Sequence, residues 1–349
     1  MMTGEAQHEA WQRRVLPPVE QPRPGLWSIP VPIPDNPMRY TLAYAFVEDH
    51  GVLLVDPGWD GPEGRRLLTE GLAAAGATPA DVTGIVLTHI HPDHHGMTGW
   101  LREQCGAWVG MHPLEAATLP GRAWRDGRHP GTDPGWLRRQ GVPEEEFAGL
   151  SVYPDRLEAL LAMAQPDRDL EDGDRLPLTD RSVRVVWTPG HTPGHLCLHD
   201  AEAGVLLTGD HLLPRITPNV AFIATSTGDP LGSYLASLDR TASFVSDEAL
   251  PAHEWRFRGI PVRVAEILAH HEKRDAEILR ALDLLDRPTT WQVAAALTWS
   301  RGWPSLRGLQ RRLALAETLA HLWHLAGNGL VSSSPGDPVR WLRSSNVHR

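Results

Sequence analysis

The densest cluster of polar side chains lies at residues 88–96, where the sequence reads THIHPDHHG directly after the apolar run 84–87. An apolar run that ends in such a cluster predicts a strand followed by a polar loop. Three histidines and a carboxylate lie within six residues: His89, His91, Asp93 and His94. Imidazole nitrogen and carboxylate oxygen are ligands that Zn²⁺ accepts. The first two histidines can bind one metal and the other two groups can reach a second, so the loop predicts a metal site.

One loop cannot complete two coordination shells, so further ligands must come from other parts of the chain. His191, Asp210 and His253 each stand just beyond an apolar, strand-like run. Strand ends gather at one edge of a layered α/β fold. We therefore expect these three side chains to join the 88–96 loop.

Short apolar runs closed by Gly, Pro or Asp predict strands at 40–47, 52–56, 84–88, 183–187 and 205–208. Residues 63–75 carry apolar side chains at helical spacing and end at Gly76. Strands that alternate with helices predict an α/β domain with layered sheets. The stretch 113–170 is helix-like but broken by Gly and Pro, and we interpret it as a helical insertion over one end of the sheets, near the active site.

The last part of the chain is mostly helix-like. A helix is expected after Pro261, a second up to Leu297 and a third over about 306–325. Two short runs on either side of the turn 335–337 predict a hairpin. Three helices and a hairpin are the order of a winged helix, which predicts a small second domain over 260–345.

Four motifs in this order resemble the metallo-β-lactamase superfamily: HxHxDH at 89–94, TPGHTPGH at 188–195, TGD at 208–210 and PAH at 251–253. The resemblance covers roughly residues 25–255. It implies an αββα sandwich, with a catalytic domain over 25–258 and the site at one edge between two sheets. The 260–345 region resembles the winged-helix tail on one branch of the superfamily, which includes lactamase-β-like endoribonucleases.

The resemblance implies that seven side chains bind two metals: His89, His91 and His191 hold the first, Asp93, His94 and His253 hold the second, and Asp210 bridges them. Asp56, in the segment LVDPG, matches another motif of the family and is expected to support the ligands through hydrogen bonds. We interpret the remaining nearby histidines as structural: His95, His112, His195 and His211.

This ligand set predicts two divalent ions, with zinc as the default and iron or manganese as alternatives. Two such ions share a water and lower its pKa toward neutrality, which makes hydroxide available at pH 7. Asp93 and Asp210 are the expected catalytic residues, and Asp93 can orient the hydroxide or relay a proton. No serine or cysteine nucleophile is needed.

Two functions compete. In the first, a small acyl compound (thioester, ester or lactone) is hydrolysed, as in the glyoxalase II-like branch. In the second, the tail holds nucleic acid while the metals cut a phosphodiester, because residues 255–349 carry 14 basic and 8 acidic groups. The arginines expected to hold phosphates are Arg301, Arg307, Arg311 and Arg312.

Net charge favours the first function. The whole chain carries a net charge of −10, and the acidic residues 1–254 would repel a polyanion. We expect the arginines of the tail to form a solvated helix face. Docking of the tail on the acidic body of the protein is an equal alternative to a separate partner. Persulfide oxidation on a single iron is a third option, but a seven-ligand set favours two metals.

Two cysteines, Cys105 and Cys197, offer no disulfide framework, and a reducing cytoplasm is the simplest location. No apolar run is long enough to span a membrane, and residues 1–14 do not resemble a signal peptide. The expected partner is the acyl substrate, with nucleic acid as the alternative and a homodimer left open.

Overall fold

The computed structural model describes residues 1–119, 133–150, 162–223, 226–245 and 247–344. The chain forms two compact units, and each is assembled from segments distant in the sequence. Unit 1 consists of Met1–Arg122, Arg156–Pro218 and Ser237–Val264, and unit 2 of Ala123–Asp155, Asn219–Ala236 and Ala265–Arg349.

Unit 1 contains two sheets. The first has seven strands in sequence order: β1 (Glu20–Arg23), β2 (Leu26–Pro32), β3 (Tyr40–Glu48), β4 (Gly51–Val55), β5 (Val82–Val86), β6 (Trp108–Met111) and β7 (Arg168–Asp169). Neighbouring strands from β1 to β4 are antiparallel, and those from β4 to β7 are parallel. The strands predicted at 40–47 and 52–56 are confirmed as β3 and β4.

The second sheet has five strands in the order β12-β11-β10-β9-β8. Its strands are β8 (Val183–Trp187), β9 (Leu196–Asp200), β10 (Val205–Gly209), β11 (Glu248–Pro251) and β12 (Phe257–Arg258). β10 and β11 are parallel, whereas the other pairs are antiparallel. The predicted strands 183–187 and 205–208 are confirmed, and the strand predicted at 84–88 lies two residues earlier, as β5.

Strand β3 shows why the two sheets stack. Successive side chains of a strand point to opposite faces. Ala43 and Ala45 of β3 lie in one buried cluster, together with the helix residues Leu68 and Leu72. Leu42, Tyr44 and Phe46 lie in a second buried cluster, which also contains residues of β9 and β10. Both faces of β3 are therefore covered, one by helices and the other by the second sheet.

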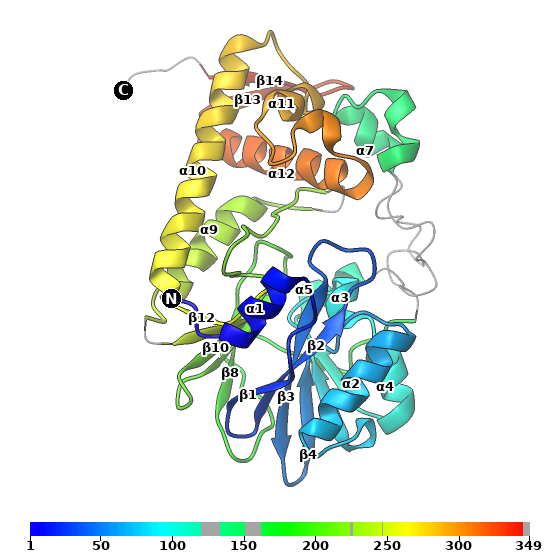
Figure 1. Ribbon diagram of the computed structural model, residues 1–349. Helices are drawn as coiled ribbons and strands as arrows, with labels where there is room; N and C mark the ends of the chain where they lie inside the picture. Colours follow the sequence, from blue (N-terminus) through cyan, green and yellow to red (C-terminus); the bar gives the residue numbers. More distant parts are fainter. Residues whose placement is uncertain (120–132, 151–161, 224–225, 246, 345–349) are drawn as a thin grey trace. The chain divides into compact units, whose positions relative to one another are not determined.

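Helices α2 (Pro62–Ala74) and α4 (Thr98–Cys105) cover the outer face of the seven-stranded sheet (Figure 1). α2 begins at Pro62, whose fixed φ suits the first turn of a helix. The helix predicted at 63–75 is thus confirmed with a shift of one residue. The other short helices in the described part of unit 1 include α1 (Glu5–Arg13), η1 (Pro79–Asp81), α3 (Pro92–His95) and α5 (Pro113–Thr118).

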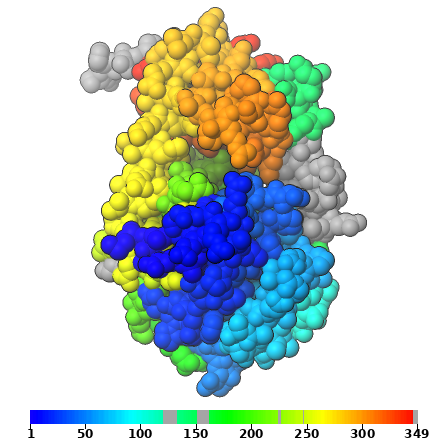
Figure 2. Space-filling view, in the orientation of Figure 1, coloured from blue at the N-terminus to red at the C-terminus, as the bar shows by residue number. Residues whose placement is uncertain are grey.

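The N-terminal helix α1 lies on the surface of unit 1, where Figure 2 shows it in deep blue. Its Trp11 is buried and packs edge-on against the rings of Tyr40 and Trp255. The guanidinium of Arg39 lies 3.8 Å above the Trp11 ring and also donates to the Trp11 carbonyl. These contacts hold the start of β3 against α1.

Unit 2 is mainly helical. Its elements include α7 (Pro134–Arg139), η2 (Glu144–Glu146), η3 (Ala148–Leu150), α11 (Thr290–Ala296), η5 (Trp303–Ser305), α12 (Gly308–Gly327), β13 (Val331–Ser334) and β14 (Arg340–Arg343). The boundary between the units falls inside α9 (Pro230–Thr241) and inside α10 (Ile260–Leu284). The expected order of three helices and a hairpin is confirmed by α10, α11, α12 and the β13–β14 pair.

The core of unit 2 joins these elements. Leu315 and Leu319 of α12 pack with Ile278 of α10 and with Trp341 of β14, which is fully buried. Thr289 begins α11 with a capping box: its hydroxyl accepts from the Gln292 N–H, and its own N–H donates to the Gln292 side chain. Local capping and burial of apolar side chains therefore agree on where α11 begins.

The expected solvated face of arginines on α12 is wrong for two of its members. Arg311 and Arg312 are each only 6% exposed. Arg311 pairs with Glu146 at 2.9 Å, and Arg312 donates to the Leu150 carbonyl at 3.1 Å. Because segment 133–150 packs in the same unit as α12, it covers this face.

The units also differ from the contiguous domains expected at 25–258 and 260–345. The described segment 133–150, expected as part of an insertion over the sheets, belongs to unit 2. Its Trp136 and Leu137 are buried in the unit 2 core. Residues 151–161 of that expected insertion lie outside the described residues.

Within the described ranges, none of the helices combines the length and the hydropathy that a membrane crossing requires. Cys105 and Cys197 are both free thiols, and Cys197 is buried. The cytoplasmic location stays a prediction.

Candidate metal centre

The centre is built on the loop that follows β5. Thr88 anchors this loop, because its N–H and its hydroxyl donate to the Asp56 carboxylate at 2.8 and 2.6 Å. Pro92 then occupies the first turn of α3, where its fixed φ is favourable. The chain thus passes from strand to helix within a few residues. This change of direction carries His91 and Asp93 to the same edge of the sheet.

Four of the seven predicted ligands form one group that could hold a metal ion: His89, His91, His191 and Asp210. Nε2 of His89 lies 2.9 Å from Nδ1 of His91, which lies 3.1 Å from Nε2 of His191. In a tetrahedral site with bonds of about 2.1 Å, ligand atoms lie about 3.4 Å apart. The spacing of the three imidazoles therefore suits a divalent ion.

The other three predicted ligands form a second such group: Asp93, His94 and His253. Oδ2 of Asp93 lies 3.5 Å from Nε2 of His253 and 3.9 Å from Nε2 of His94. Asp93 and His94 lie in α3, and His253 lies just beyond β11, as expected for that residue. The structure thus brings together the seven residues singled out in the sequence.

Asp210 faces both groups. Its Oδ2 lies 3.6 Å from Nε2 of His191, in the first group. Its Oδ1 lies 3.2 Å from Nε2 of His253 and 3.6 Å from Nε2 of His94, in the second. Such a carboxylate can bind one ion through each oxygen.

Gly209 allows Asp210 to take this position. Its φ is +48°, a conformation that strongly favours glycine. A Cβ at this position would lie 2.7 Å from Nε2 of His195 and 2.9 Å from Oγ1 of Thr88. The glycine of the TGD motif therefore serves both the turn and the close packing beneath the centre.

Two buried atoms support the fit of a cation. Nε2 of His94 and Oδ1 of Asp210 are buried and make no hydrogen bond of regular geometry among the described residues, although Nε2 of His253 lies 3.2 Å from Oδ1. Buried polar atoms are nearly always partnered, because an unpartnered one costs about 1–3 kcal/mol. Both atoms point into the centre, and a metal ion would satisfy both.

The charge states of the first group also fit. Burial, together with the neighbouring imidazoles of His94 and His91, holds the pKa of His89 well below its ordinary value. Burial and then His191 lower the pKa of His91 to about 3. Both rings are therefore neutral at pH 7, which metal binding requires.

The second group is richer in negative charge. Burial opposes the charged form of His94, but the carboxylates of Asp56, Asp210 and Asp93 outweigh it and raise the pKa of His94 to about 10. Burial likewise opposes ionisation of Asp210, yet the imidazoles of His253 and His94 hold its pKa well below the ordinary value. The carboxylates therefore favour positive charge here, and a bound cation would supply the charge that the proton on His94 otherwise provides.

Hydrogen bonds orient the rings from behind. Nδ1 of His94 lies 2.8 Å from Oδ2 of Asp56, and Nδ1 of His253 lies 2.8 Å from the Tyr40 carbonyl. Each acceptor fixes the proton on Nδ1 and leaves Nε2 free to face the centre. Asp56 holds a left-handed φ of +49°, and Asp is one of the residue types that tolerate this conformation. The supporting role expected for Asp56 agrees with this geometry.

The four histidines interpreted as structural lie outside both groups. His195 accepts from the Asp210 N–H, and His95 hydrogen-bonds the Ala164 carbonyl. The His112 ring stacks on Trp187, and His211 lies 2.8 Å from the Thr241 hydroxyl. Each of these contacts is structural.

Comparison with known proteins decides the family. The family model described as "Metallo-beta-lactamase superfamily" matches residues 37–253, which include all seven residues of the centre. The chain belongs to the metallo-beta-lactamase superfamily. Both sheets and the two groups of His and Asp side chains lie largely within the matched range.

A solved superfamily structure covers nearly the whole chain. A metallo-beta-lactamase family protein from Thermus thermophilus is 34% identical with a TM-score of 0.77, over 92% of this chain and 99% of that one. The similarity therefore extends over both units.

Curated relatives are more distant. "Lactamase-like protein adaB" of Aspergillus niger is 26% identical over 66% of this chain, and the match spans 55% of adaB. "Atrochrysone carboxyl ACP thioesterase" of Passalora fulva is 24% identical over 76% of this chain and 64% of that protein.

Glu115 is a residue of the centre that sequence reasoning missed. It is the third residue of α5 and is fully buried. Burial raises its pKa to about 7, although the N–H groups of Gly194 and Ile90 favour the charged form. An acidic residue in the first turn of a helix is common on protein surfaces. The sequence thus held no signal that this carboxyl lies beneath the metal groups.

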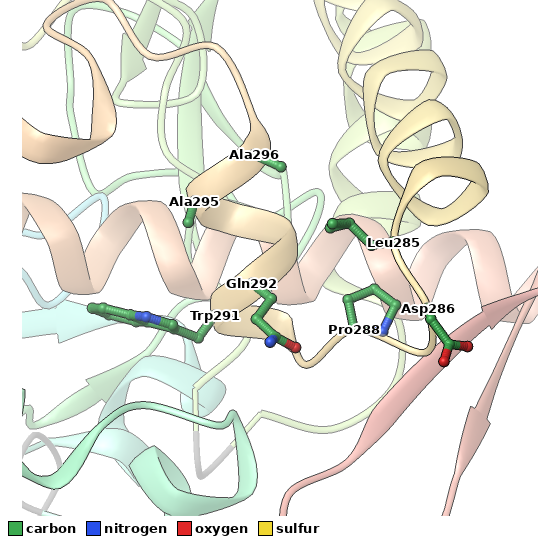
Figure 3. A pocket seen from close by; sticks show the side chains of 7 residues that line it. All are labelled: Leu285, Asp286, Pro288, Trp291, Gln292, Ala295 and Ala296. Atoms are coloured by element: carbon green, nitrogen blue, oxygen red, sulfur yellow. The ribbon is translucent and has the colours of Figure 1, made fainter.

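A hollow in unit 2 has a different character. It measures about 450 Å³ and is lined by Leu285, Asp286, Pro288, Trp291, Gln292, Ala295 and Ala296 (Figure 3). Asp286 is its sole titratable lining residue, and Figure 3 shows its carboxylate at the edge, directed away from Trp291. The lining offers no pair of groups for acid–base or metal chemistry.

Proposed function

We propose that this chain hydrolyses a small acyl substrate, a thioester, ester or lactone, at a centre of two divalent metal ions. The observation that carries the proposal is the carboxylate of Asp210, whose two oxygens face two separate groups of ligands. With a single ion, one of these two groups of ligands would remain without a metal. Two-metal sites, by contrast, commonly have ions about 3.5–4 Å apart, a separation that a bridging carboxylate can span.

The assignment of ligands follows the two groups: His89, His91 and His191 would hold one ion, Asp93, His94 and His253 the other, and Asp210 would bridge them. Two such ions supply an ionised water at neutral pH and polarise the group under attack. With imidazole and carboxylate ligands and no thiolate, zinc is the first choice, and iron and manganese also suit the set.

We propose that Asp93 orients the attacking water and accepts its proton. Its side chain is 19% exposed, compared with 13% for Asp210, so it is the carboxylate more open to the substrate side. Its backbone is held by the Thr41 hydroxyl, which donates to the Asp93 carbonyl at 2.8 Å. A fixed, partly exposed carboxylate beside the centre can orient a water and accept its proton.

The burial of two arginines of the tail favours an acyl substrate over nucleic acid. Arg311 and Arg312, two of the four arginines expected to hold phosphates, are buried and bound to groups of unit 2, whereas Arg301 and Arg307 are exposed. The net charge of −10 also opposes a polyanion. The name of the Passalora fulva relative, an ACP thioesterase, supports a thioester among the acyl candidates. We further propose that α10, α11, α12 and the hairpin form a winged helix that serves packing.

The test is a substrate panel run on metal-loaded protein, with thioesters, lactones, simple esters and a phosphodiester. We expect hydrolysis in the acyl classes, and loss of that activity in His91→Ala and Asp210→Ala with folding retained. His50→Ala, at an exposed histidine in the β3–β4 turn, is the matched control and keeps full activity. Phosphodiester cleavage without acyl hydrolysis, or full activity in both ligand variants, would overturn the proposal.

A further inference from the structure

Glu115 links the two loops that carry the first metal group. Its Oε2 accepts from the Ile90 N–H at 3.0 Å, and its Oε1 accepts from the Gly194 N–H at 2.6 Å. Ile90 stands between two ligands of the first group, His89 and His91. Gly194 lies three residues after the third imidazole of that group, His191. A single side chain therefore fixes both loops through their backbones.

The packing around this contact is tight. A Cβ on Gly194 would lie 2.9 Å from Glu115 Cγ, 2.9 Å from Glu115 N and 2.9 Å from Nδ1 of His112. Any side chain at 194 would push the loop away from α5. The last glycine of the TPGHTPGH motif is thus explained by the close approach of the loop to Glu115.

The second group has supports of its own. Asp56 orients His94, and the Tyr40 carbonyl orients His253. Neither support involves α5. A change at Glu115 should therefore lower the metal affinity of the first group more than that of the second. In the first group, the distance between the two loops determines the distance between the imidazoles.

We propose that Glu115 is a positioning residue for the first metal group: its carboxylate holds the 88–91 loop and the 188–195 loop at the separation that His91 and His191 need to share one ion. The proposal rests on the two-metal centre proposed above. Hydrogen bonds to the ligands themselves typically account for about 10–100-fold in metal affinity, and we expect an effect of this order from bonds that hold the ligand-bearing loops.

Glu115→Gln is the sharpest variant. The amide keeps the volume of the side chain, but its nitrogen cannot accept, so one backbone N–H faces another donor. Two variants of the metal ligands separate the effect of Glu115→Gln on the first group from its effect on the second. His253→Ala weakens the second group and leaves the first, whereas His191→Ala weakens the first and leaves the second.

We expect Glu115→Gln to weaken zinc binding about 10–100-fold in the His253→Ala background and less than about twofold in the His191→Ala background. Affinity is measured by competition with a chromophoric zinc chelator. Glu248→Gln, at a buried glutamate paired with Arg23 and Arg256, is the matched control and leaves both affinities unchanged. Glu115→Asp, which keeps the charge, gives an intermediate loss and serves if the glutamine variant does not fold.

Equal weakening in both backgrounds, or none in either, would overturn the positioning role while leaving the two-metal centre intact. If instead neither background binds zinc before Glu115 is changed, the proposed centre fails, and the role of Glu115 fails with it. The two failures are thereby distinguished.

Discussion

Replacement of Asp56 by asparagine should weaken metal binding through the tautomer of His94. Oδ2 of Asp56 lies 2.8 Å from Nδ1 of His94 and also accepts from the Thr88 hydroxyl, while Oδ1 accepts from the Thr88 N–H. With asparagine, the oxygen can stay with the Thr88 N–H, which places the amide NH₂ against Nδ1 of His94. The ring must then accept at Nδ1 and carry its proton on Nε2, the atom that faces the centre.

The size of the effect follows from the bond that is lost. A hydrogen bond to a charged group contributes about 1.5–3 kcal/mol, which corresponds to about 10- to 150-fold in affinity. Asparagine tolerates the left-handed φ of +49° at this position, so the backbone turn should survive. The loss should therefore appear in metal affinity more than in folding.

Chelator competition for the second equivalent of zinc, with urea unfolding of the metal-free proteins, measures both quantities. Asp200→Asn is the control, because Asp200 is also buried and accepts from a backbone N–H, that of Ala203. Affinity in Asp56→Asn within twofold of wild type would refute the proposed role of the carboxylate in fixing the His94 tautomer.

Three further predictions concern the fold around the centre and unit 2. Gly209→Ala should lower the free energy of unfolding by about 2–4 kcal/mol in urea titrations, because φ of +48° and the contact with His195 both oppose a Cβ; an unchanged midpoint would contradict this. Arg311→Ala should cost about 2 kcal/mol through loss of packing and of the Glu146 pair, measured in the same way, whereas a solvated arginine would cost under about 0.5 kcal/mol. Burial and His321 lower the pKa of His271 to about 2. Below pH 6.5, His271 is therefore protonated in the unfolded chain but stays neutral in the folded chain. Stability from this residue is therefore complete above pH 6.5 and falls with decreasing pH, by about 2 kcal/mol at pH 5, and His271→Asn should lose that part of the pH dependence.

The metal groups could be predicted because their residues stand in a recognisable local pattern along the sequence. His191, Asp210 and His253 each follow an apolar run, and the strands of a layered fold end at a common edge. Hydrophobic periodicity located β3, β4, β8 and β10 for the same reason. Burial on both faces of β3 confirms that the runs are strands of a sandwich.

What the sequence did not reveal depends on partners distant along the chain. Arg312 looks solvated in a helical pattern, yet its guanidinium lies 4.9 Å from the ring of Trp136, a residue of segment 133–150. Glu115 resembles an ordinary acidic residue in a helix N-terminus until the 188–195 loop packs on it. A local sequence pattern does not indicate which distant segment covers a charged side chain. For the same reason, it does not predict that each unit is assembled from segments distant in the sequence.

The most direct measurement is the number of zinc ions bound per chain after dialysis of purified protein, determined by elemental analysis for wild type and for Asp210→Ala. Because Asp210 faces both groups, we predict two ions per chain in wild type and fewer than two in the variant. One ion or none in wild type, or two ions retained in Asp210→Ala, would contradict a centre of two metals joined by this carboxylate.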